Sequence, residues 1–159
     1  MNIRHVEQSE ISQLFALLQA KAEFDGCADS LRATVSTLRE AIFSERPLAQ
    51  ALVAEVDGRL VGMATYYPIF SSFIARPGLW LDDLYVDEAY RSRSVGRRLM
   101  ERLCRIACDN GCARIDWLVA VANARGIDFY RLIGAEVSVE VRHARLGEAA
   151  IRKLADRLE

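Results

Sequence analysis

Four arginines surround a short segment that joins a strand-like stretch to a helix-like stretch: Arg91, Arg93, Arg97 and Arg98. Residues 79–86 are mostly apolar, whereas apolar side chains recur at helical spacing from residue 95 onward. A helix that starts just after a strand has unpaired N–H groups in its first turn, and these groups favour a phosphate. The segment could therefore bind a phosphate; an ordinary strand-to-helix connection with solvated arginines is the alternative.

Two adjacent acids, Asp82 and Asp83, lie in the apolar stretch before this segment. In a strand their side chains point to opposite faces, so only one of them can face a given cleft. The alternative is that both are solvated or salt-bridged surface acids.

The loop sequence Arg91-Ser92-Arg93-Ser94-Val95-Gly96 resembles the pyrophosphate loop of the GNAT superfamily of N-acetyltransferases, whose pattern is R/Q-x-x-G-x-G/A. Ser94 stands where the family usually has glycine, and Ser92 stands where it often has glycine. If Ser94 needs a positive φ, a residue other than glycine costs on the order of 1 kcal/mol there. Its hydroxyl could offset this cost by donating to a phosphate oxygen, so we expect binding to survive.

A second segment supports the resemblance. Residues 123–135 resemble the later Asn…Phe-Tyr…Gly motif of the family, and the two segments come in the expected order and at the expected distance. The resemblance covers nearly the whole chain. Residues 66–68 and 81–86 are most similar to the diamine acetyltransferases of the spermidine/spermine type.

The resemblance implies acetyl-CoA as co-substrate and no metal. Backbone groups of Leu84, Tyr85 and Val86 would pair with the pantetheine arm like an added strand, and the Val86 N–H would face the thioester oxygen. Asn123 and Gly126 would complete the wall of the pocket. The residues that would hold the pyrophosphate are Arg91, Ser92, Arg93, Ser94, Val95, Gly96 and Arg97.

Tyr130 stands at the position of the family's general acid. A phenol of pKa ~10 is protonated at neutral pH and can donate to a departing thiolate of pKa ~8.5. By the same resemblance Tyr130 also contributes to the cofactor site. The alternative is that Phe129 and Tyr130 only pack on a helix.

On the acceptor side, Asp82 stands where the diamine enzymes carry a glutamate, which implies that it attracts a cationic amine or accepts its proton through water. Phe24 and Asp25 resemble an aromatic-acid pair that holds the substrate of those enzymes. Residues 139–145 lack the acid-Gly-Trp run of those enzymes and are basic, with Arg142 and Arg145. A long polycation would meet these arginines unfavourably. A smaller amine, or one that carries a carboxylate, fits better.

Composition limits the other possibilities. A chain of 159 residues can bury a proper core, so we expect a single domain over residues 1–159. A net charge of −1 argues against a nucleic-acid surface, and no apolar run is long enough to span a membrane. The four cysteines, with few other ligands nearby, indicate free thiols in a reducing compartment, so we expect a cytoplasmic protein without a metal site.

The first half of the chain predicts a strand over residues 3–6, followed by a helix that Ser9 caps and that ends near residue 24. A second helix would start with Ser30 as its cap and end before Pro47. Residues 48–56 and 60–67 flank Asp57-Gly58-Arg59, which predicts a β-hairpin. Residues 68–78 read as a loop that contains apolar side chains.

In the second half, residues 79–86 form the predicted central strand and residues 95–110 a helix that ends before Gly111. The apolar run 113–121 predicts a buried strand, and a helix would follow from residue 123 or 124 to Gly134. The alternation over 136–142 predicts a half-exposed strand, and residues 148–158 a terminal helix that includes Leu158.

These elements predict an α/β fold, and the resemblance implies a GNAT-like mixed, mostly antiparallel central sheet with helices on both faces. The predicted function is transfer of an acetyl group from acetyl-CoA to a primary amine of a small molecule, by direct attack in a ternary complex. The alternatives are a protein or peptide N-acetyltransferase and a non-catalytic acyl-CoA-binding regulatory module. We expect no nucleic-acid or membrane partner, and the diamine resemblance implies a homodimer.

Overall fold

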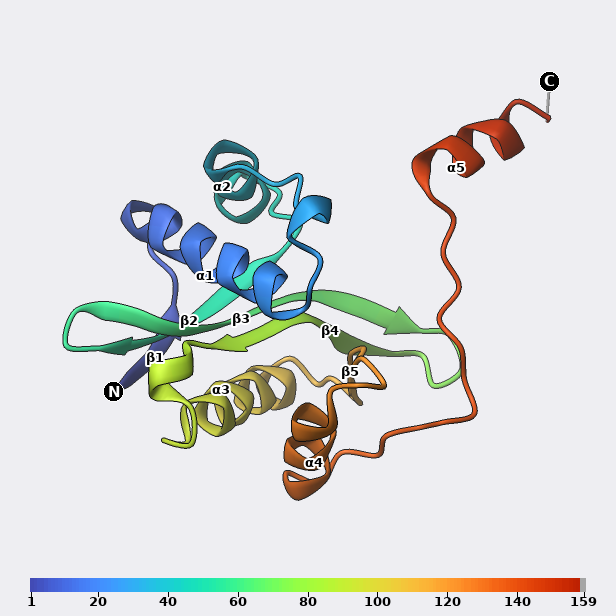
Figure 1. Ribbon diagram of the computed structural model, residues 1–159. Helices are drawn as coiled ribbons and strands as arrows, with labels where there is room; N and C mark the ends of the chain where they lie inside the picture. The colour runs from blue at the N-terminus through green and yellow to red at the C-terminus, as the bar shows by residue number, and fades with distance from the viewer. Residues whose placement is uncertain (158–159) are drawn as a thin grey trace. The chain divides into compact units, whose positions relative to one another are not determined.

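A five-stranded sheet forms the centre of the first unit of this computed structural model, which describes residues 1–157. The chain divides into two units, Met1–Leu118 and a second unit that begins at Val119. Figure 1 shows the sheet and the helices α1, α2 and α3 in the first unit, and α4 and α5 in the second. The single domain expected over residues 1–159 stays a prediction.

The sheet is mixed and mostly antiparallel, as predicted. Its strands lie in the order β1-β2-β3-β4-β5, and only the last pair, β4 and β5, runs parallel. The bounds are β1 Asn2–His5, β2 Gln50–Val56, β3 Arg59–Ser71, β4 Arg76–Val86 and β5 Ile115–Asp116.

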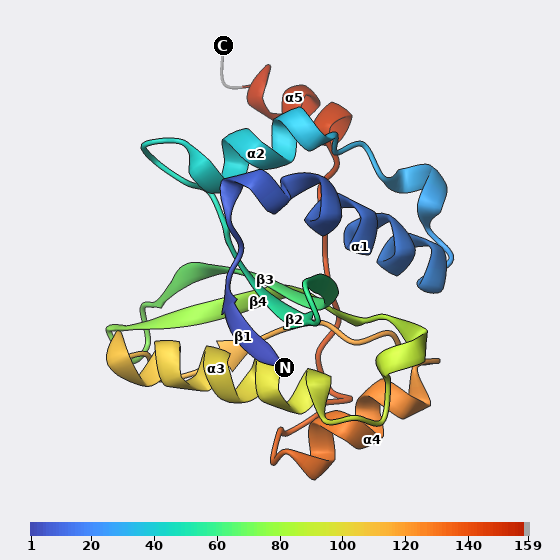
Figure 2. The ribbon, with the colours of Figure 1, turned by 90° about the vertical axis from the view of Figure 1, so that its left-hand side faces the viewer.

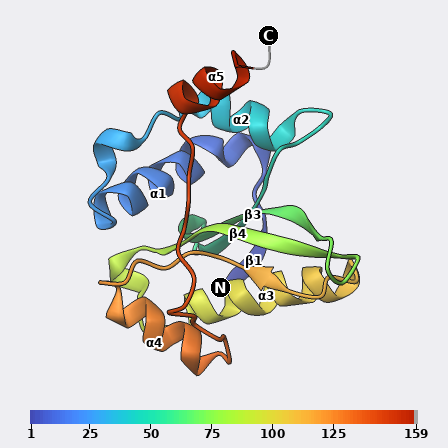
Figure 3. The same ribbon diagram turned by 90° about the vertical axis from the view of Figure 1, so that its right-hand side faces the viewer.

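Helices cover both faces of this sheet. Figures 2 and 3 show α1 (Ile11–Phe24) and α2 (Val35–Phe43) on one face and α3 (Val95–Asp109) on the other. Short 3-10 helices lie at η1 (Gln8–Glu10), η2 (Ala28–Ser30) and η3 (Glu88–Tyr90). The second unit contains α4 (Ala124–Leu132) and α5 (Glu148–Ala155); Leu158 of the predicted terminal helix lies outside the described residues.

Each face of the sheet buries the apolar side of the helices that cover it. On the first face, Ile11 and Leu14 of α1 pack with Val53 and Met63 of the sheet. On the second face, α3 turns its apolar side inward, and the buried residues are Val95, Leu99, Met100, Leu103 and Ala107. Burial of these side chains from water supplies the main driving force for the three-layer arrangement.

The predicted hairpin is confirmed at Asp57 and Gly58. Both residues have positive φ, 50° and 77°, so the turn matches the right-handed twist of β2 and β3. The predicted loop over residues 68–78 is wrong, because β3 and β4 continue as a long hairpin through Ser71 and Arg76. Pro68 is compatible with the strand because β2 pairs only as far as Tyr66, so Pro68 faces a partner strand on one side.

The helix caps differ from those predicted. Ser9 lies inside η1, and the Glu10 carboxylate accepts the N–H of Glu7 at the start of this turn, at 2.9 Å. Ser30 ends η2, whereas Thr34 caps α2 by accepting the N–H of Thr37 at 3.2 Å. These local side-chain hydrogen bonds satisfy the first N–H groups and so fix where each helix starts.

Two predicted strands fail to form as expected. The run 113–121 contributes only Ile115 and Asp116 to the sheet, and Val121 is 95% exposed, so its apolar character does not reflect burial. Residues 136–142 are irregular, with Val139 and Val141 both exposed. Alternation predicts a strand only where a neighbouring strand supplies hydrogen bonds, and none pairs with this segment in residues 1–157.

Candidate active site

A β-bulge marks the middle of β4. Thr65 of β3 pairs with Asp83 and Tyr66 pairs with Leu81, so Asp82 is the extra residue of the bulge. Asp82 is exposed. Burial raises the pKa of Tyr67, and the negative charge of Asp82 raises it further.

β4 continues to Val86, beyond the residues that pair with β5. β5 pairs with Leu79 and Trp80 only, so within residues 1–157 no further strand lies beside residues 81–86 on this edge. An extended ligand could use the backbone groups of Leu84, Tyr85 and Val86 in the way that a peptide adds a strand to a sheet.

The basic loop follows directly at the end of β4. Asp87 accepts the N–H of Ala89 at 3.0 Å and starts η3, and α3 begins at Val95. Ser92 and Ser94 have φ values of 62° and 61°, in the left-handed region that favours glycine. The positive φ considered for Ser94 from the sequence is therefore confirmed, and both serines hold a glycine-like backbone before the first turn of α3.

The arginines of the loop have different partners. Arg91 turns back toward the strand, where its Nε–H donates to the carbonyl of Val86 at 3.0 Å. Its guanidinium carbon lies 4.7 Å from the ring centre of Phe24 and 5.7 Å from that of Tyr85. Arg91 thus connects the end of α1, the end of β4 and the start of the loop.

The remaining arginines lie on the surface. Arg93 stacks over Tyr90 at 5.4 Å, and Arg97 forms an ion pair of 3.0 Å with Glu101 one turn further along α3. Arg93, Arg97 and Arg98 are exposed. Exposed arginine side chains are held only weakly by such contacts and can reorient toward an anionic ligand.

The end of α1 lies against the same face of β4. The rings of Phe24 and Tyr85 meet edge to face at 6.4 Å. Lys21, one turn earlier, contacts the carboxylates of both Asp25 and Asp83, with 3.2 Å between Nζ and Asp83 Oδ1. Of the two adjacent acids, Asp83 is thus the one beside the segment that contains Phe24 and Asp25.

Sequence reasoning missed Lys21 and Thr65. The Thr65 hydroxyl donates to Asp83 at 3.0 Å, so Asp83 has two partners from different elements. The spacing of Lys21 and Asp25, four residues apart on a helix, indicates their ion pair. The contacts with Asp83 form only when β3, β4 and α1 pack together, and no local pattern predicts them.

The second unit contains Asn123, Gly126 and Tyr130. The predicted helix start at residue 123 or 124 is confirmed, because α4 begins at Ala124 with Asn123 as its cap, the Oδ1 of which accepts the N–H of Gly126 at 2.9 Å. A Cβ at Gly126 would lie 2.6 Å from Asn123 Nδ2, so the cap requires glycine at this position. Tyr130 is buried, and its ring centre lies 5.4 Å from that of Phe129.

The predicted site residues therefore fall into two groups. The first unit brings together the end of α1, the bulged β4 and the basic loop, and the second unit holds the capped α4 with Tyr130. No group of three or more His, Cys, Asp or Glu side chains in residues 1–157 could hold a metal ion. In that same range no helix is both long and apolar enough to cross a membrane.

Comparison with known proteins gives consistent results. A family model described as acetyltransferase (GNAT) family matches residues 12–135. The thialysine N-epsilon-acetyltransferase of Sus scrofa is 27% identical over 164 aligned positions, which cover 96% of each chain. The spermidine/spermine N(1)-acetyltransferase-like protein 1 of Homo sapiens is 31% identical over 140 positions, 84% of this chain and 20% of that protein.

Solved structures share the fold. An integron cassette protein from the mobile metagenome of V. cholerae superposes with a TM-score of 0.78. The two sequences are 25% identical, and the match covers 97% of this chain and 96% of the other.

Proposed function

This chain belongs to the acetyltransferase (GNAT) family and is an acetyl-CoA-dependent N-acetyltransferase, and we propose that its acceptor is a primary amine of a small molecule. Two similar proteins are named for thialysine and for spermidine/spermine, which supports a small amine. The observation that carries the proposal is the loop between β4 and α3, where a glycine-like backbone and exposed arginines precede a helix.

Acetyl-CoA fits this loop and the neighbouring strand edge. The helix start and the side chains of Arg93 and Arg97 offer donors and positive charge to a pyrophosphate. The open edge of β4 offers the backbone groups of Leu84 to the pantetheine amides. Arg91 acts differently from its neighbours, because its guanidinium already binds the end of β4.

The proposed reaction is direct attack of the amine on the thioester in a ternary complex. The Val86 N–H would donate to the thioester oxygen and stabilise the charge that develops on it. Tyr130 would donate its phenolic proton to the departing thiolate, and Asp82 would accept the proton of the amine through water.

Asp82 is also proposed to attract the cationic acceptor, since it is an exposed carboxylate at the bulge. We predict that Asp82→Asn raises the KM for the amine more than the KM for acetyl-CoA. Steady-state kinetics with both substrates varied would measure this. Asp109→Asn, an exposed acid at the end of α3, is a matched control. If both constants stay unchanged in the Asp82 variant, its role is structural.

The acceptor is proposed to be short or to carry a carboxylate. Arg142 and Arg145 lie in the irregular, exposed segment that precedes α5, and their charge disfavours a long polycation. The name of the thialysine enzyme supports an acceptor of the amino-acid type.

A thiol-release assay over a library of amines and peptides tests this function. We expect release of CoA with small amines and little release with peptides. Preferential use of peptides would instead identify a protein N-acetyltransferase, and CoA binding without turnover would identify a regulatory module. Calorimetry with CoA and with dephosphorylated pantetheine tests the loop, and equal affinities would exclude it as the phosphate site.

The diamine resemblance also supports a homodimer, which sedimentation measurements would test. The cysteines of residues 1–157 are free thiols, which supports a cytoplasmic location.

A further inference from the structure

Lys21 bridges two carboxylates at the end of α1. Its ammonium contacts Asp25, one helical turn away, and Asp83 of β4. Asp83 is held from its other side by the hydroxyl of Thr65, at 3.0 Å. The side chains of Lys21 and Asp83 are only 19% and 20% exposed, so this contact is largely removed from water.

The ammonium stays charged in this position. Burial lowers the pKa of Lys21, but the hydrogen bond to Asp25 and the charge of Asp83 act in the opposite direction, and the net pKa is raised. Lys21 and the two carboxylates together carry a net charge of −1, and the guanidinium of Arg91, 4.7 Å from the ring centre of Phe24, adds a second positive charge beside them. The exposed carboxylate of Asp25 and the part-buried carboxylate of Asp83 repel each other, and the ammonium between them offsets this repulsion.

Aromatic rings complete the surroundings of the cluster. Phe24 precedes Asp25 in the chain, and Tyr85 lies two residues after Asp83 on the same face of β4. The two rings contact each other at 6.4 Å. Paired carboxylates beside aromatic rings are the chemistry that binds an alkylammonium ion.

We propose that the ammonium of Lys21 occupies the position between Asp25 and Asp83 that the second ammonium of a diamine would otherwise take. Lys21 is then a specificity-determining residue that restricts acceptors to amines with a single cationic end. This inference rests on the proposed function, because it concerns which small amines the enzyme accepts.

The physical basis is competition for the same two carboxylates. A diamine that placed its far ammonium at this cluster would have to displace Lys21 or lie beside it, and like charges at close range repel. An amine with one cationic end, including one whose other end is a carboxylate, does not meet this repulsion. Removing the lysine charge while keeping an apolar side chain should open the position.

The test compares Lys21→Met with Lys21→Arg, which keeps the positive charge. Arg39→Met in α2 removes an exposed cation elsewhere and controls for the change in net charge. Equilibrium binding of 1,4-diaminobutane and of butylamine is measured by calorimetry for each protein, and kcat/KM for both amines is measured with acetyl-CoA. Thermal unfolding establishes that each variant is folded.

We expect Lys21→Met to raise the preference for the diamine over the monoamine by roughly tenfold, since hydrogen bonds between charged groups are among the stronger ones. Lys21→Arg and Arg39→Met should keep the wild-type preference. Adding Asp83→Asn to Lys21→Met should abolish the gain, because the carboxylate that would hold the second ammonium is then neutral.

The binding and the turnover measurements together separate this inference from the proposed function. If the wild type acetylates amines and Lys21→Met changes neither the binding nor the turnover preference, the inference is overturned and the function stands. If Lys21→Met gains diamine binding while no protein turns over any amine, the inference stands and the proposed function fails. A gain of the same size in Arg39→Met would also overturn the inference, because net charge alone would then explain it.

Discussion

Backbone strain at single residues is concentrated in the basic loop. Ser92 and Ser94 both adopt the left-handed conformation, with φ near 60°. A residue other than glycine pays on the order of 1 kcal/mol for this conformation. The loop keeps its shape despite that cost, which supports a requirement of the proposed phosphate site for this geometry.

We predict that Ser94→Gly leaves CoA affinity unchanged or increases it, and raises stability by up to about 1 kcal/mol, because glycine adopts a positive φ without strain. Calorimetry with CoA and urea unfolding would measure both effects. Ser44→Gly is a matched control, since Ser44 has an ordinary φ of −70° and glycine there should destabilise. A large loss of CoA affinity in Ser94→Gly would identify the hydroxyl as a phosphate ligand.

A second prediction at this scale concerns Tyr130. Tyr130→Phe removes only the hydroxyl and keeps the buried ring, so packing and CoA affinity should barely change. We expect kcat to fall by about 10²–10⁴-fold, as for the loss of a general acid. Single-turnover kinetics and CoA calorimetry would measure the two quantities. An unchanged rate of the chemical step would reduce Tyr130 to a packing residue.

The sequence predicts single residues well where the signal is local. The start of α4 follows from the neighbouring residues 123 and 124, and the positive φ of Ser94 agrees with the family pattern, in which glycine usually stands at this position. It does not predict that Lys21 bridges Asp25 and Asp83, because Asp83 comes from a distant part of the chain. Contacts of that kind depend on how elements pack.

At the scale of elements, Arg91 contacts α1 and β4 from its place in the basic loop and so connects all three. Its Nε–H holds the Val86 carbonyl, and its guanidinium stacks near Phe24 and Tyr85. Arg91, the first residue of the loop, therefore holds Val86, the residue proposed to lie beside the thioester, in place. Arg91 positions Val86 in addition to any attraction it exerts on phosphate.

We predict that Arg91→Lys lowers kcat/KM by roughly tenfold, because lysine keeps the charge but loses the planar stacking and the Nε–H donor. Kinetics with both substrates should show a fall in kcat as well as weaker CoA binding. Arg105→Lys, an exposed arginine of α3, is the control for this conservative exchange. If only CoA affinity changes in Arg91→Lys, its role is limited to binding phosphate.

The elements themselves are predicted unevenly. The Asp57-Gly58 hairpin and α3 follow from turn chemistry and from helical spacing, both of which are local. β5 is far shorter than its apolar run, and residues 136–142 are irregular although they alternate. Within residues 1–157 the segment 136–142 has no partner strand, whereas the run 113–121 stops pairing with β4 after Asp116 although β4 continues to Val86; a pattern along one segment reveals neither.

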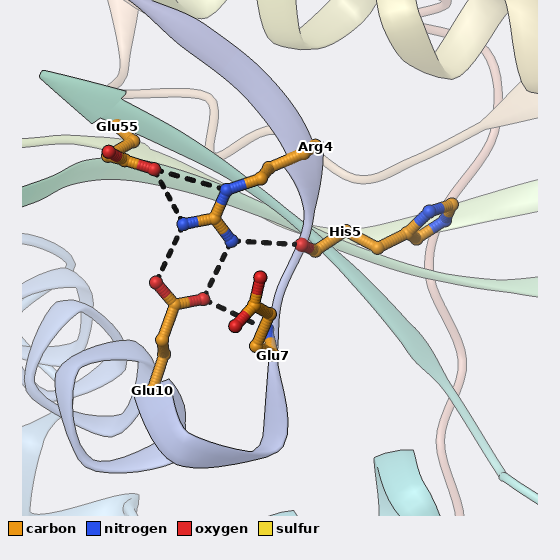
Figure 4. Close-up of polar contacts among 5 residues, drawn as sticks. All are labelled: Arg4, His5, Glu7, Glu10 and Glu55. Atoms are coloured by element: carbon orange, nitrogen blue, oxygen red, sulfur yellow. Dashed lines mark hydrogen bonds and ion pairs between the residues drawn. The ribbon is translucent and has the colours of Figure 1, made fainter. Parts of the chain in front are cut away.

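At the scale of the whole molecule, a network of ion pairs near the start of the chain joins elements of the first unit. Figure 4 shows Arg4 of β1 between Glu10 at the start of α1 and Glu55 of β2. The guanidinium donates to Glu10 at 2.7 Å and to Glu55 at 2.6 Å, and the carboxylate of Glu10 also accepts the N–H of Glu7. This network joins the edge of the sheet to the helix layer above it.

The last prediction is that acid weakens the fold through this network. The hydrogen bond from Arg4 lowers the pKa of Glu10 below its ordinary value near 4.5, and this effect exceeds the opposing effect of burial. A carboxylate whose pKa is lowered on folding stabilises the protein above the unfolded pKa. That stabilisation is lost as the pH falls through the folded pKa, because the folded state must then take up the proton.

Glu10→Gln should therefore be less stable than the wild type at pH 7, by about 1–2 kcal/mol, and the difference should shrink as the pH falls from about 5 toward 3. Urea unfolding across this pH range would measure it. Glu23→Gln, an exposed glutamate of α1, should follow the wild type. If Glu10→Gln and the wild type lose stability in parallel below pH 5, the carboxylate of Glu10 contributes nothing to the acid response, and the ion pair with Arg4 is only a surface contact.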